Sequence, residues 1–595
     1  MHTALVGLAG GLVGAAFFAA VERTQQLLLE RVSGYQPLRA AGERFQDDLP
    51  SIGFHPILLV VVLTLGGLAV GLMTRWAPEI ASGGTDTFIE AVHARAGVIR
   101  RRVAAAKFLA SMITLGTGGS GGREGPSMLI GGALGSFVSS VLKLSPRERR
   151  LLVIAGAAAG VSAVFRTPLG AALLAVEVLY RDGFESDALV PSILASVISY
   201  SVVISIFGES TLFTHATRYP FVPAHLPLYG LLALLTALVA LAFESSIRRT
   251  RALFERVKPP WIRPAIGGLA LGLFCVPIVV LVGHRTGTPG QGLGLLGSGY
   301  GAVQLAINGS GLFGRGGAAV ELLILLTVGK LVASSLTLGS GGSAGDFAPS
   351  MVIGGLFGGA FGHAATLVLH DPRLDPSSFV LVGMGAFYGG IAHVPLSAMV
   401  LVCELAGSYD LLVPLMLAEA VAFVLLRKRT LYAGQLTGSN VAGSSSINPL
   451  VGLLVSDVLS SADRPIAFSP NAKLGEMFDV LQTPEGRTQV VFPVVDASSK
   501  IVGIVAGSTV VTVRGDEELS RWILAADLMQ KPITASASTT LVDAARLMIT
   551  HDLDAIPVVG ESDEIIGLLS HADVTRAYLE SARGASGPAR PASIV

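Results

Sequence analysis

Long apolar stretches dominate the first 432 residues and constrain the fold more than any other feature of the sequence. Several reach the roughly 20 residues that a helix needs to cross the hydrocarbon core of a bilayer. Others are short, or are interrupted by glycine and proline. Because irregular backbone cannot face lipid, the interrupted segments must be buried in protein or line a water-filled cavity. This pattern predicts an all-α polytopic membrane domain, of the kind found in transporters and channels. The stretches are 4–22, 56–75, 151–179, 187–207, 226–243, 263–282, 319–338, 350–369, 378–405 and 411–426.

The overall composition also indicates a membrane protein. Charged residues make up 14% and hydrophobic residues 51% of the 595 residues, whereas soluble domains are about 25% charged. The net charge of zero gives no indication of a nucleic-acid partner. Cys275 and Cys403 both lie in apolar runs, which disfavours a disulfide or a cysteine metal site. Since the HExxH and phosphate-loop motifs do not occur, we expect no enzyme, no catalytic residues and no metal site.

The N-terminal segment MHTALVGLAGGLVGAAFFAAVE has two interpretations. It resembles a signal peptide with a small-residue cleavage site. It has no Lys or Arg before the apolar run, however, and the run continues into the amphipathic VERTQQLLLERV. We therefore expect a membrane helix that is retained.

A glycine-rich motif occurs twice in the chain. KFLASMITLGTGGSGGREGPSMLIGG begins at Lys107, and KLVASSLTLGSGGSAGDFAPSMVIGG begins at Lys330. The similarity continues downstream, where Glu177 aligns with Glu404. Duplicated halves with interrupted helices at matching positions predict a substrate site near the middle of the membrane, between the halves. The alignment alone leaves open whether the halves are parallel or inverted.

Each copy is expected to form a loop that leads into the N-terminus of a helix. The run GTGGSGGREGP has little helix propensity, and Pro126 suits the first turn of a new helix. The free backbone N–H groups and the positive end of the helix dipole make such an N-terminus an anion site. Two copies aimed at one place would replace the hydration shell of an anion without a fixed cation that traps it.

Two other roles compete for these glycines. GTGGSG fits the dinucleotide pattern GxGxxG, but no acidic residue follows at the required spacing. Close packing of membrane helices is the second role, and it is the better explanation of IGGALGS and IGGLFGG.

Glu124 is the most informative residue of the motif, because the second copy has Phe347 at that position. An ionisable side chain at membrane depth is costly and indicates a functional site by default. At a helix N-terminus its carboxylate can imitate a bound anion, blocking the site when ionised and leaving it when protonated. The competing interpretation is a salt bridge between Glu124 and Arg123 in a surface loop.

These residues resemble a known family. GTGGSGGREGP looks like the signature of the CLC chloride channels and chloride/proton exchangers, and GDFAP looks like its partner in the second half. The resemblance covers residues 1–432, with repeats of roughly 1–215 and 226–432. It implies a membrane domain with two inverted-repeat halves, one anion pathway in each subunit, and a homodimer.

The resemblance also implies roles for single residues. Glu124 takes the position of the gating glutamate. Three elements supply the anion-binding positions: Ser82 in ASGGT, the backbone N–H groups of Asp346 and Phe347 in GDFAP, and Tyr432 in RTLYAGQL. Phe347 would also line the pore. The helix N-termini at the anion site comprise Gly122, Arg123, Gly125 and Ala348.

Around the predicted anion site the chain departs from the family pattern. Ala81, Gly84 and Thr85 replace the Gly, Ile and Pro that flank the pore serine in the family. Asp346 adds an acid where an apolar residue is common. Its side chain is expected to turn away from the pore while its backbone N–H faces the anion.

A further departure concerns proton coupling. Proton-coupled members often have an internal glutamate where this chain has Val178, which can neither donate nor accept a proton. The adjacent Glu177 is expected to share a structural role with Glu404. The prediction is therefore a passive chloride channel. The alternative is a chloride/proton antiporter that lacks the internal glutamate.

The chain changes character after Tyr432. A polar, Gly/Ser-rich linker spans 433–455. Two β–α patterns follow, at 456–514 and 526–580, and they resemble a tandem pair of α/β CBS modules, which the family often carries on the cytoplasmic side. RKR at 427–429 agrees with that side. The tail, 581–595, has a composition typical of disorder.

CBS pairs can bind adenine nucleotides in the cleft between modules. In the second module Ser570 and Asp573 match the positions that contact phosphate and ribose, and Ile556 and Val558 would form a wall for the base. The first module has no matching Asp, so a purely structural dimerisation role competes with nucleotide binding.

The expected substrates are chloride and similar small anions. The expected partners are the lipid bilayer and a second copy of the chain, in the plasma or inner membrane. No cofactor is required, and an adenine nucleotide at the CBS pair is the one candidate. A membrane-anchored adenine-nucleotide sensor is the alternative of a different class, and nucleotide binding without anion flux would support it.

Overall fold

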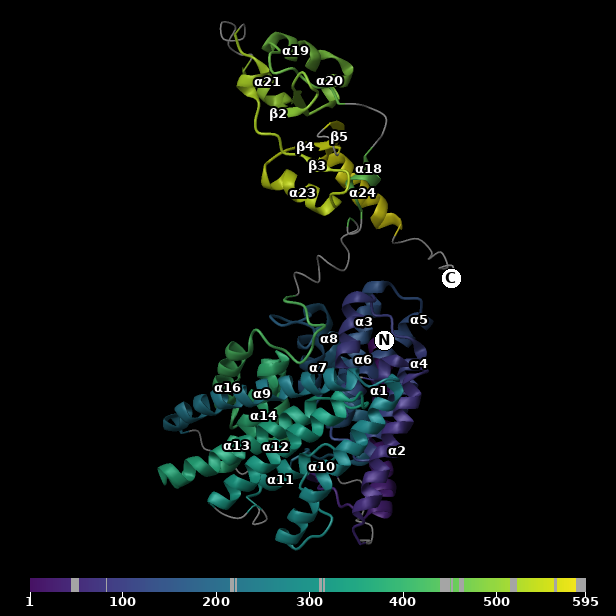
Figure 1. Ribbon diagram of the computed structural model, residues 1–595, viewed down its shortest axis with the longest axis vertical. Coiled ribbons are helices and arrows are strands. Elements are labelled where there is room, and N and C mark those ends of the chain that lie inside the picture. The colour runs from purple at the N-terminus through teal and green to yellow at the C-terminus, as the bar shows by residue number, and fades with distance from the viewer. Residues whose placement is uncertain are drawn as a thin grey trace. The chain divides into compact units, whose positions relative to one another are not determined.

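The apolar stretches fold mainly into helices in the computed structural model. The chain divides into two units, Met1–Ala442 and Gly443–Val595 (Figure 1). The structure describes residues 1–43, 53–81, 83–213, 219, 222–309, 313, 316–438, 450, 453–459, 465–513, 522–560 and 564–584.

The first unit is helical throughout its described residues, apart from connecting loops and isolated bridges. Its α-helices are α1 (His2–Gln25), α2 (Pro56–Thr74), α3 (Thr85–Ala94), α4 (Arg101–Gly116), α5 (Glu124–Val141), α6 (Pro146–Phe165), α7 (Pro168–Glu177), α8 (Ser186–Phe207), α9 (Leu226–Glu255), α10 (Arg263–Thr286), α11 (Tyr300–Ile307), α12 (Gly317–Gly339), α13 (Phe347–Leu369), α14 (Pro376–Ala392), α15 (Pro395–Ala406) and α16 (Leu412–Leu426). A π-helix, η1 (Gln26–Ser33), extends α1, and short 3-10 turns are η2 (Ala41–Glu43), η3 (Pro78–Ile80), η4 (Pro223–His225) and η5 (Pro260–Ile262).

Within the described residues, seven helices are long and apolar enough to cross a membrane. They are His2–Ser33, Pro56–Thr74, Ser186–Phe207, Pro223–Glu255, Pro260–His284, Gly317–Gly339 and Phe347–Leu369. Shorter apolar helices, among them α7, α14 and α15, lie between them. In α14 every residue from Ser377 to Ala392 is buried. The predicted mixture of full-length and interrupted segments is therefore confirmed, and α14 is covered by protein, as a segment too short to span requires.

Small residues allow the helices to pack closely. An added Cβ at Gly131 in α5 would lie 2.1 Å from the carbonyl oxygen of Gly156 in α6. The same probe at Gly354 in α13 would lie 2.3 Å from the carbonyl oxygen of Gly383 in α14. The packing role predicted for IGGALGS and IGGLFGG is confirmed. In α1, Gly10 contacts Ala159 of α6 in the same way, so the N-terminal segment is an integral part of the unit.

The hydrogen bonds between the two glycine-rich copies are reciprocal. Gly122 and Gly345, which occupy equivalent positions in the two copies, each donate a backbone N–H to the other's carbonyl oxygen, at 2.8 and 2.7 Å. Two serine pairs repeat this exchange, namely Ser120–Ser334 at 2.9 Å and Ser343–Ser111 at 3.0 Å. Reciprocal contacts between equivalent residues mean that a local two-fold axis relates the two halves of the unit.

The second unit has the α/β fold predicted for it. One sheet contains β1 (Val491–Val495) antiparallel to β2 (Ile501–Ala506). The other places β3 (Ala535–Ser536) parallel to β4 (Ala555–Val559), which is antiparallel to β5 (Ile565–Ser570). The helices are α18 (Val455–Val458), α19 (Leu474–Gln482), α20 (Pro484–Thr488), α21 (Gly507–Val513), α22 (Ala525–Leu528), α23 (Leu541–Thr550) and α24 (His571–Gly584). Most of the predicted disordered tail lies outside the described residues.

The two α/β modules are interleaved. Val455 of α18 packs into the core of the second module, with Leu541 and Ile556. Ala525 of α22 packs into the core of the first module, with Leu474. Each module therefore takes a short helix that lies outside its own stretch of sequence.

Candidate anion pathway

The N-termini of α5 and α13 meet at the bonded pair Gly122–Gly345. α5 begins at Glu124 and α13 at Phe347, so each helix starts two residues after its bonded glycine. Both positive helix ends therefore face one region, as the duplicated motif predicts. Four of the positions predicted for these termini, Gly122, Arg123, Gly125 and Ala348, all lie at this junction.

Glu124 places its carboxylate inside the junction. The side chain is 1% exposed, and its Oε1 accepts a 2.9 Å hydrogen bond from the hydroxyl of Tyr300. Oε2 lies beside Gly122, has the backbone N–H of Ala348 nearby, and makes no hydrogen bond among the described residues. A carboxylate held between two helix N-termini occupies the kind of place in which a small anion would bind.

Arg123 does not pair with Glu124. Its guanidinium forms ion pairs with Glu22, at 3.3 Å, and with Glu43, and it lies over the ring of Phe18 at 4.8 Å. The competing interpretation of Glu124 as half of an Arg123 salt bridge is therefore wrong. Sequence reasoning missed Glu22 and Glu43, although a glutamate at the end of an apolar helix was a visible signal for Glu22.

Tyr300 is a second site residue that sequence reasoning missed. It is fully buried at the start of α11 and packs edge-on against Phe165 and Phe213, with ring centroids 6.1 and 6.0 Å away. The signal was an aromatic residue inside the glycine-rich run GLGLLGSGYG. Its hydroxyl is the hydrogen-bond donor that holds the Glu124 carboxylate.

Phe347 and Tyr432, which were predicted to line the pore, lie together. Phe347 is 2% exposed and packs against Tyr388, with ring centroids 4.4 Å apart. The hydroxyl of Tyr388 lies 3.3 Å from that of Tyr432. Tyr432 in turn donates a 2.8 Å hydrogen bond to Oδ1 of Asp346. The expectation that the Asp346 side chain turns away from the pore is therefore wrong, because the Tyr432 hydroxyl provides a donor for it.

Ser82 lies outside the described residues, but the loop that carries it is informative. Gly84 has a φ of +106°, and an added Cβ there would lie 2.6 Å from the carbonyl oxygen of Gly125. Only glycine suits this position, which explains the departure from the family's isoleucine. The loop thus packs directly on the first turn of α5.

Glu177 and Glu404 cap each other's half. Glu177, at the end of α7, accepts backbone N–H bonds from Leu396 at 3.1 Å and Ser397 at 2.7 Å, and also a bond from the Ser397 hydroxyl. Glu404 accepts the backbone N–H groups of Leu169 and Gly170, at 3.1 and 2.8 Å. Their shared structural role is confirmed.

Val178 is fully buried. The second half of the membrane unit contains another buried acid, Glu419. Glu419 in α16 is 1% exposed and lies against Gly385 and Gly389 of α14. Neither carboxylate oxygen has a hydrogen-bond partner among the described residues. Sequence reasoning missed it, although a lone acid in the apolar run LLVPLMLAEAVAFVLL was visible.

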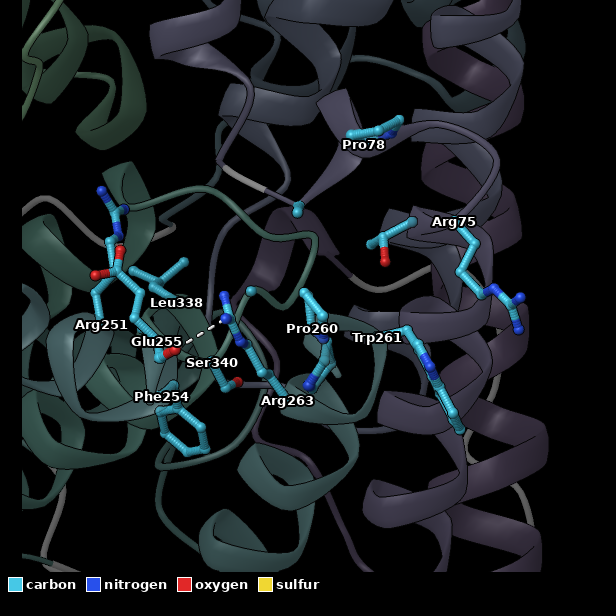
Figure 2. Close-up of a pocket in the computed structure, with 15 residues that line it drawn as sticks. Arg75, Pro78, Arg251, Phe254, Glu255, Pro260, Trp261, Arg263, Leu338 and Ser340 are labelled. Atoms are coloured by element: carbon cyan, nitrogen blue, oxygen red, sulfur yellow. Dashed lines mark hydrogen bonds between the residues drawn. The ribbon is translucent and has the colours of Figure 1, made fainter. Parts of the chain in front are cut away.

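A cavity of about 510 Å³ opens beside the glycine-rich loops (Figure 2). Its lining includes Ala81, next to Ser82, and Gly341 of the second copy. Arg75, Arg251 and Arg263 also line it. Figure 2 shows Arg263 directed at Glu255, whose carbonyl oxygen it bonds at 3.0 Å. We refer to this cavity as the arginine vestibule.

Comparison with known proteins agrees with this geometry. A family model described as "Voltage gated chloride channel" matches residues 65–427. The chain belongs to the CLC family. The resemblance read from GREGP and GDFAP is thereby confirmed, and a CBS-domain model matches residues 525–580, within the second α/β module.

Individual CLC relatives cover most of the chain. The H(+)/Cl(-) exchange transporter ClcA of Salmonella gallinarum is 29% identical over 80% of this chain and 91% of its own length. ClcA of Yersinia pestis is 28% identical over 69% of this chain and 81% of its own.

Two solved structures share the CLC fold. A slow cyanobacterial Cl−/H+ antiporter has a TM-score of 0.60 at 22% identity and covers 71% of this chain and 93% of its own. A eukaryotic CLC transporter has a TM-score of 0.56 at 18% identity, with coverage of 96% and 97%.

In the CBS unit of this CLC protein, the predicted nucleotide residues make structural contacts. The Ser570 hydroxyl donates to Oδ2 of Asp573 at 2.6 Å, and the Asp573 N–H bonds back to Ser570 at 3.3 Å, which caps α24. The side chains of Ile556 and Val558 are fully buried in the module core. Nucleotide binding stays a prediction, and the positions of these side chains agree with the competing structural role.

Proposed function

We propose that this CLC protein moves chloride across the membrane in exchange for protons. The observation that carries this proposal is the Glu124 carboxylate, which lies between two helix N-termini and has the Tyr300 hydroxyl as its hydrogen-bonded side-chain partner. Relatives that cover most of the chain are named H(+)/Cl(-) exchange transporters. They favour the exchanger over the passive channel that Val178 predicts.

The proposed gate follows from electrostatics. An ionised Glu124 carboxylate neutralises the positive helix ends and occupies the place of an anion. When Glu124 takes up a proton, the helix ends lose that charge and chloride is favoured in its place. Each proton that reaches Glu124 thus admits an anion, which links the two movements. The proposed chloride ligands are the Ser82 and Tyr432 hydroxyls and the backbone N–H groups of Asp346 and Phe347.

The arginine vestibule supports an orientation for the pathway. The segment 248–263 contains the last two turns of α9, the connection and the first residue of α10. It is rich in Arg and Lys, and membrane proteins place such segments in the cytoplasm. The vestibule, lined by Arg251 and Arg263 of this segment, would then face the cytoplasm. We place the CBS unit on the same side, since it follows α16 and the basic run 427–429, and we propose a homodimer in the plasma or inner membrane.

The deciding measurement is the reversal potential of the purified protein in a planar bilayer or in liposomes. Under a fixed chloride gradient, an exchanger shifts its reversal potential when a pH gradient is added. Glu124→Gln should abolish that shift, keep chloride flux, and flatten the dependence of flux on pH.

Other outcomes select the alternatives. A wild-type reversal potential that follows the chloride gradient alone indicates the passive channel. Adenine-nucleotide binding with no anion flux indicates the membrane-anchored sensor. A Glu124→Gln variant with the parent's pH profile removes Glu124 from the gate.

A further inference from the structure

At position 178, where proton-coupled members of the family often have a glutamate, this chain has no residue that can carry a proton to the cytoplasm. Val178 is buried and has no ionisable group. Glu177 beside it accepts hydrogen bonds from two backbone N–H groups and one hydroxyl of α15, which fixes its carboxylate as a helix cap. A proton that passes between Glu124 and the cytoplasm needs another carrier.

Asp346 has the required position. It is the residue before α13, next to Phe347, and it is partly exposed while its neighbours Gly345 and Phe347 are buried. Glu124 holds its carboxylate near the backbone N–H of Ala348, in the first turn of the same helix. Along α13, Phe347 therefore lies between Asp346 and Ala348, the residue whose backbone N–H is near the Glu124 carboxylate.

Asp346 is also joined to a chain of hydroxyl groups. Tyr432 donates to Asp346 at 2.8 Å, and the Tyr388 hydroxyl lies 3.3 Å from that of Tyr432. The ring of Tyr388 packs against Phe347. Hydroxyl groups both donate and accept hydrogen bonds, so this chain can pass a proton by exchanging donor and acceptor roles.

The charged groups that act on Asp346 come from two further helices. Asp86 lies on α3 and Arg251 on α9. Arg251 also lines the arginine vestibule, so the charge that acts on Asp346 belongs to the cavity through which cytoplasmic water and anions would reach the pathway. The like charge of Asp86 and the opposite charge of Arg251 partly offset each other, so neither sign of charge alone determines whether Asp346 carries its proton.

We propose that Asp346, hydrogen-bonded to Tyr432, is the inner proton carrier of the exchange. This inference rests on the proposed proton coupling and names the residue that performs it. A proton leaving the Glu124 carboxyl is taken up by the Asp346 carboxylate and is then released to water in the vestibule; the reverse direction uses the same groups. When Asp346 is ionised it accepts from the Tyr432 hydroxyl, and when it is neutral that hydroxyl becomes available to chloride. Proton uptake at Asp346 and anion binding at Tyr432 are thereby linked.

The test measures proton and chloride movement together in liposomes that contain the full chain. Wild type is measured first, because a wild type without coupling contradicts the proposed exchange itself and not the choice of Asp346. In a coupled background, Asp346→Asn should lower the ratio of protons to chloride at least about tenfold, since an amide cannot take up a proton. The ratio is the readout, because the chloride rate will also change when the partner of Tyr432 is altered. Asp346→Glu should restore coupling.

Glu419→Gln is the matched control, and it should keep the wild-type ratio. An Asp346→Asn variant with the wild-type ratio overturns the proposal, and loss of coupling in Glu419→Gln alone would assign the role to Glu419. If Asp346→Asn does not fold, calorimetry on Glu124→Gln gives an independent result. Chloride binding to that variant should still take up protons, seen as a binding enthalpy that depends on the buffer. No proton uptake there also overturns the proposal.

Discussion

At the scale of single residues, the proposed gate depends on a small number of contacts around Glu124. Arg123, its neighbour in the chain, is held by Glu22 and Glu43, so its charge is already compensated. Tyr300 alone supplies a side-chain hydrogen bond to the carboxylate in the described part of the protein. The position of the Glu124 carboxylate therefore depends on a tyrosine hydroxyl more than on a salt bridge.

Tyr300→Phe tests this dependence. Removing a donor to a charged group costs about 1.5–3 kcal/mol, so the carboxylate should leave its seat more readily. We expect faster chloride efflux at neutral pH from liposomes loaded with chloride. Tyr229→Phe is the matched control, because the Tyr229 hydroxyl bonds Ser378 and not Glu124; efflux from this variant should not change. Equal efflux from Tyr300→Phe and wild type would show that the helix ends alone hold the carboxylate.

The sequence predicted the site unevenly at this scale. Glu124 and Phe347 could be found because the duplication places an acid in one copy and a phenyl ring in the other. Tyr300 and Glu22 each carried a signal in the sequence, but their roles were missed because their contacts join segments far apart in the chain. The side-chain direction of Asp346 was predicted wrongly, because it depends on a hydroxyl more than 80 residues away, whose position the motif does not contain.

At the scale of elements, the two halves of the membrane unit stabilise each other's short helices. α7 ends in Glu177, which caps the start of α15, and α15 carries Glu404, which caps the start of α7. Short helices leave a large share of their backbone N–H groups unpaired. The exchange of caps satisfies these groups at a place where water is scarce.

Removing the caps should therefore destabilise the unit in a graded manner. Glu404→Ala leaves two backbone N–H groups without their acceptor and should cost about 2 kcal/mol. Glu177→Ala removes the acceptor of three hydrogen bonds at a more buried site. Its cost in stability should therefore be larger. Glu244→Ala breaks an i,i+4 ion pair with Arg248, whose side chain is 57% exposed, and should cost only about 0.3–0.5 kcal/mol.

The measurement is the temperature at which the detergent-solubilised protein loses its native elution volume. The expected order of the loss in stability is Glu177, Glu404, Glu244. If the Glu404→Ala variant melts at the same temperature as the Glu244→Ala variant, the capping bonds contribute little to the stability of the unit.

At the scale of the whole membrane unit, the proposed entrance for anions is a cavity with more basic than acidic residues in its lining. Arg75, Arg251 and Arg263 line the vestibule, although the chain has no net charge. The lining also contains one acidic residue, Glu255, against these three arginines. A cavity lined mainly by one sign of charge raises the local concentration of counter-ions, and salt screens the effect over about 10 Å at 0.1 M.

Arg251→Gln should lower chloride uptake from the vestibule side, and the deficit should shrink as ionic strength rises. Arg248→Gln, on the same helix but outside the vestibule lining, is the control. Uptake rates measured with chloride fixed and an impermeant salt varied provide the comparison. A deficit that does not respond to salt would assign Arg251 a local structural role.

The architecture at this scale was largely predictable. Apolar runs of bilayer length, broken runs and alternating β–α patterns each report a local physical constraint, so they indicated an α-helical membrane domain followed by an α/β pair. The local two-fold axis was predictable only through the family resemblance, because the repeat in sequence is by itself compatible with more than one spatial relation. The interleaving of the α/β modules was not predictable either. α18 packs into the second module, far downstream in the sequence, and α22 packs into the first module, which lies upstream.

This interleaving also sets an order of events on the ribosome. The chain segment around Val455 is made early, but its backbone partners, Ala537 and Thr539, emerge more than 80 residues later. The first module likewise waits for Ala525, which bonds Ala472. Neither module can close its core until synthesis has reached the second one. A nascent chain that stalls between the modules therefore exposes apolar surface. That surface is what quality-control factors can use to distinguish the stalled chain from the finished protein.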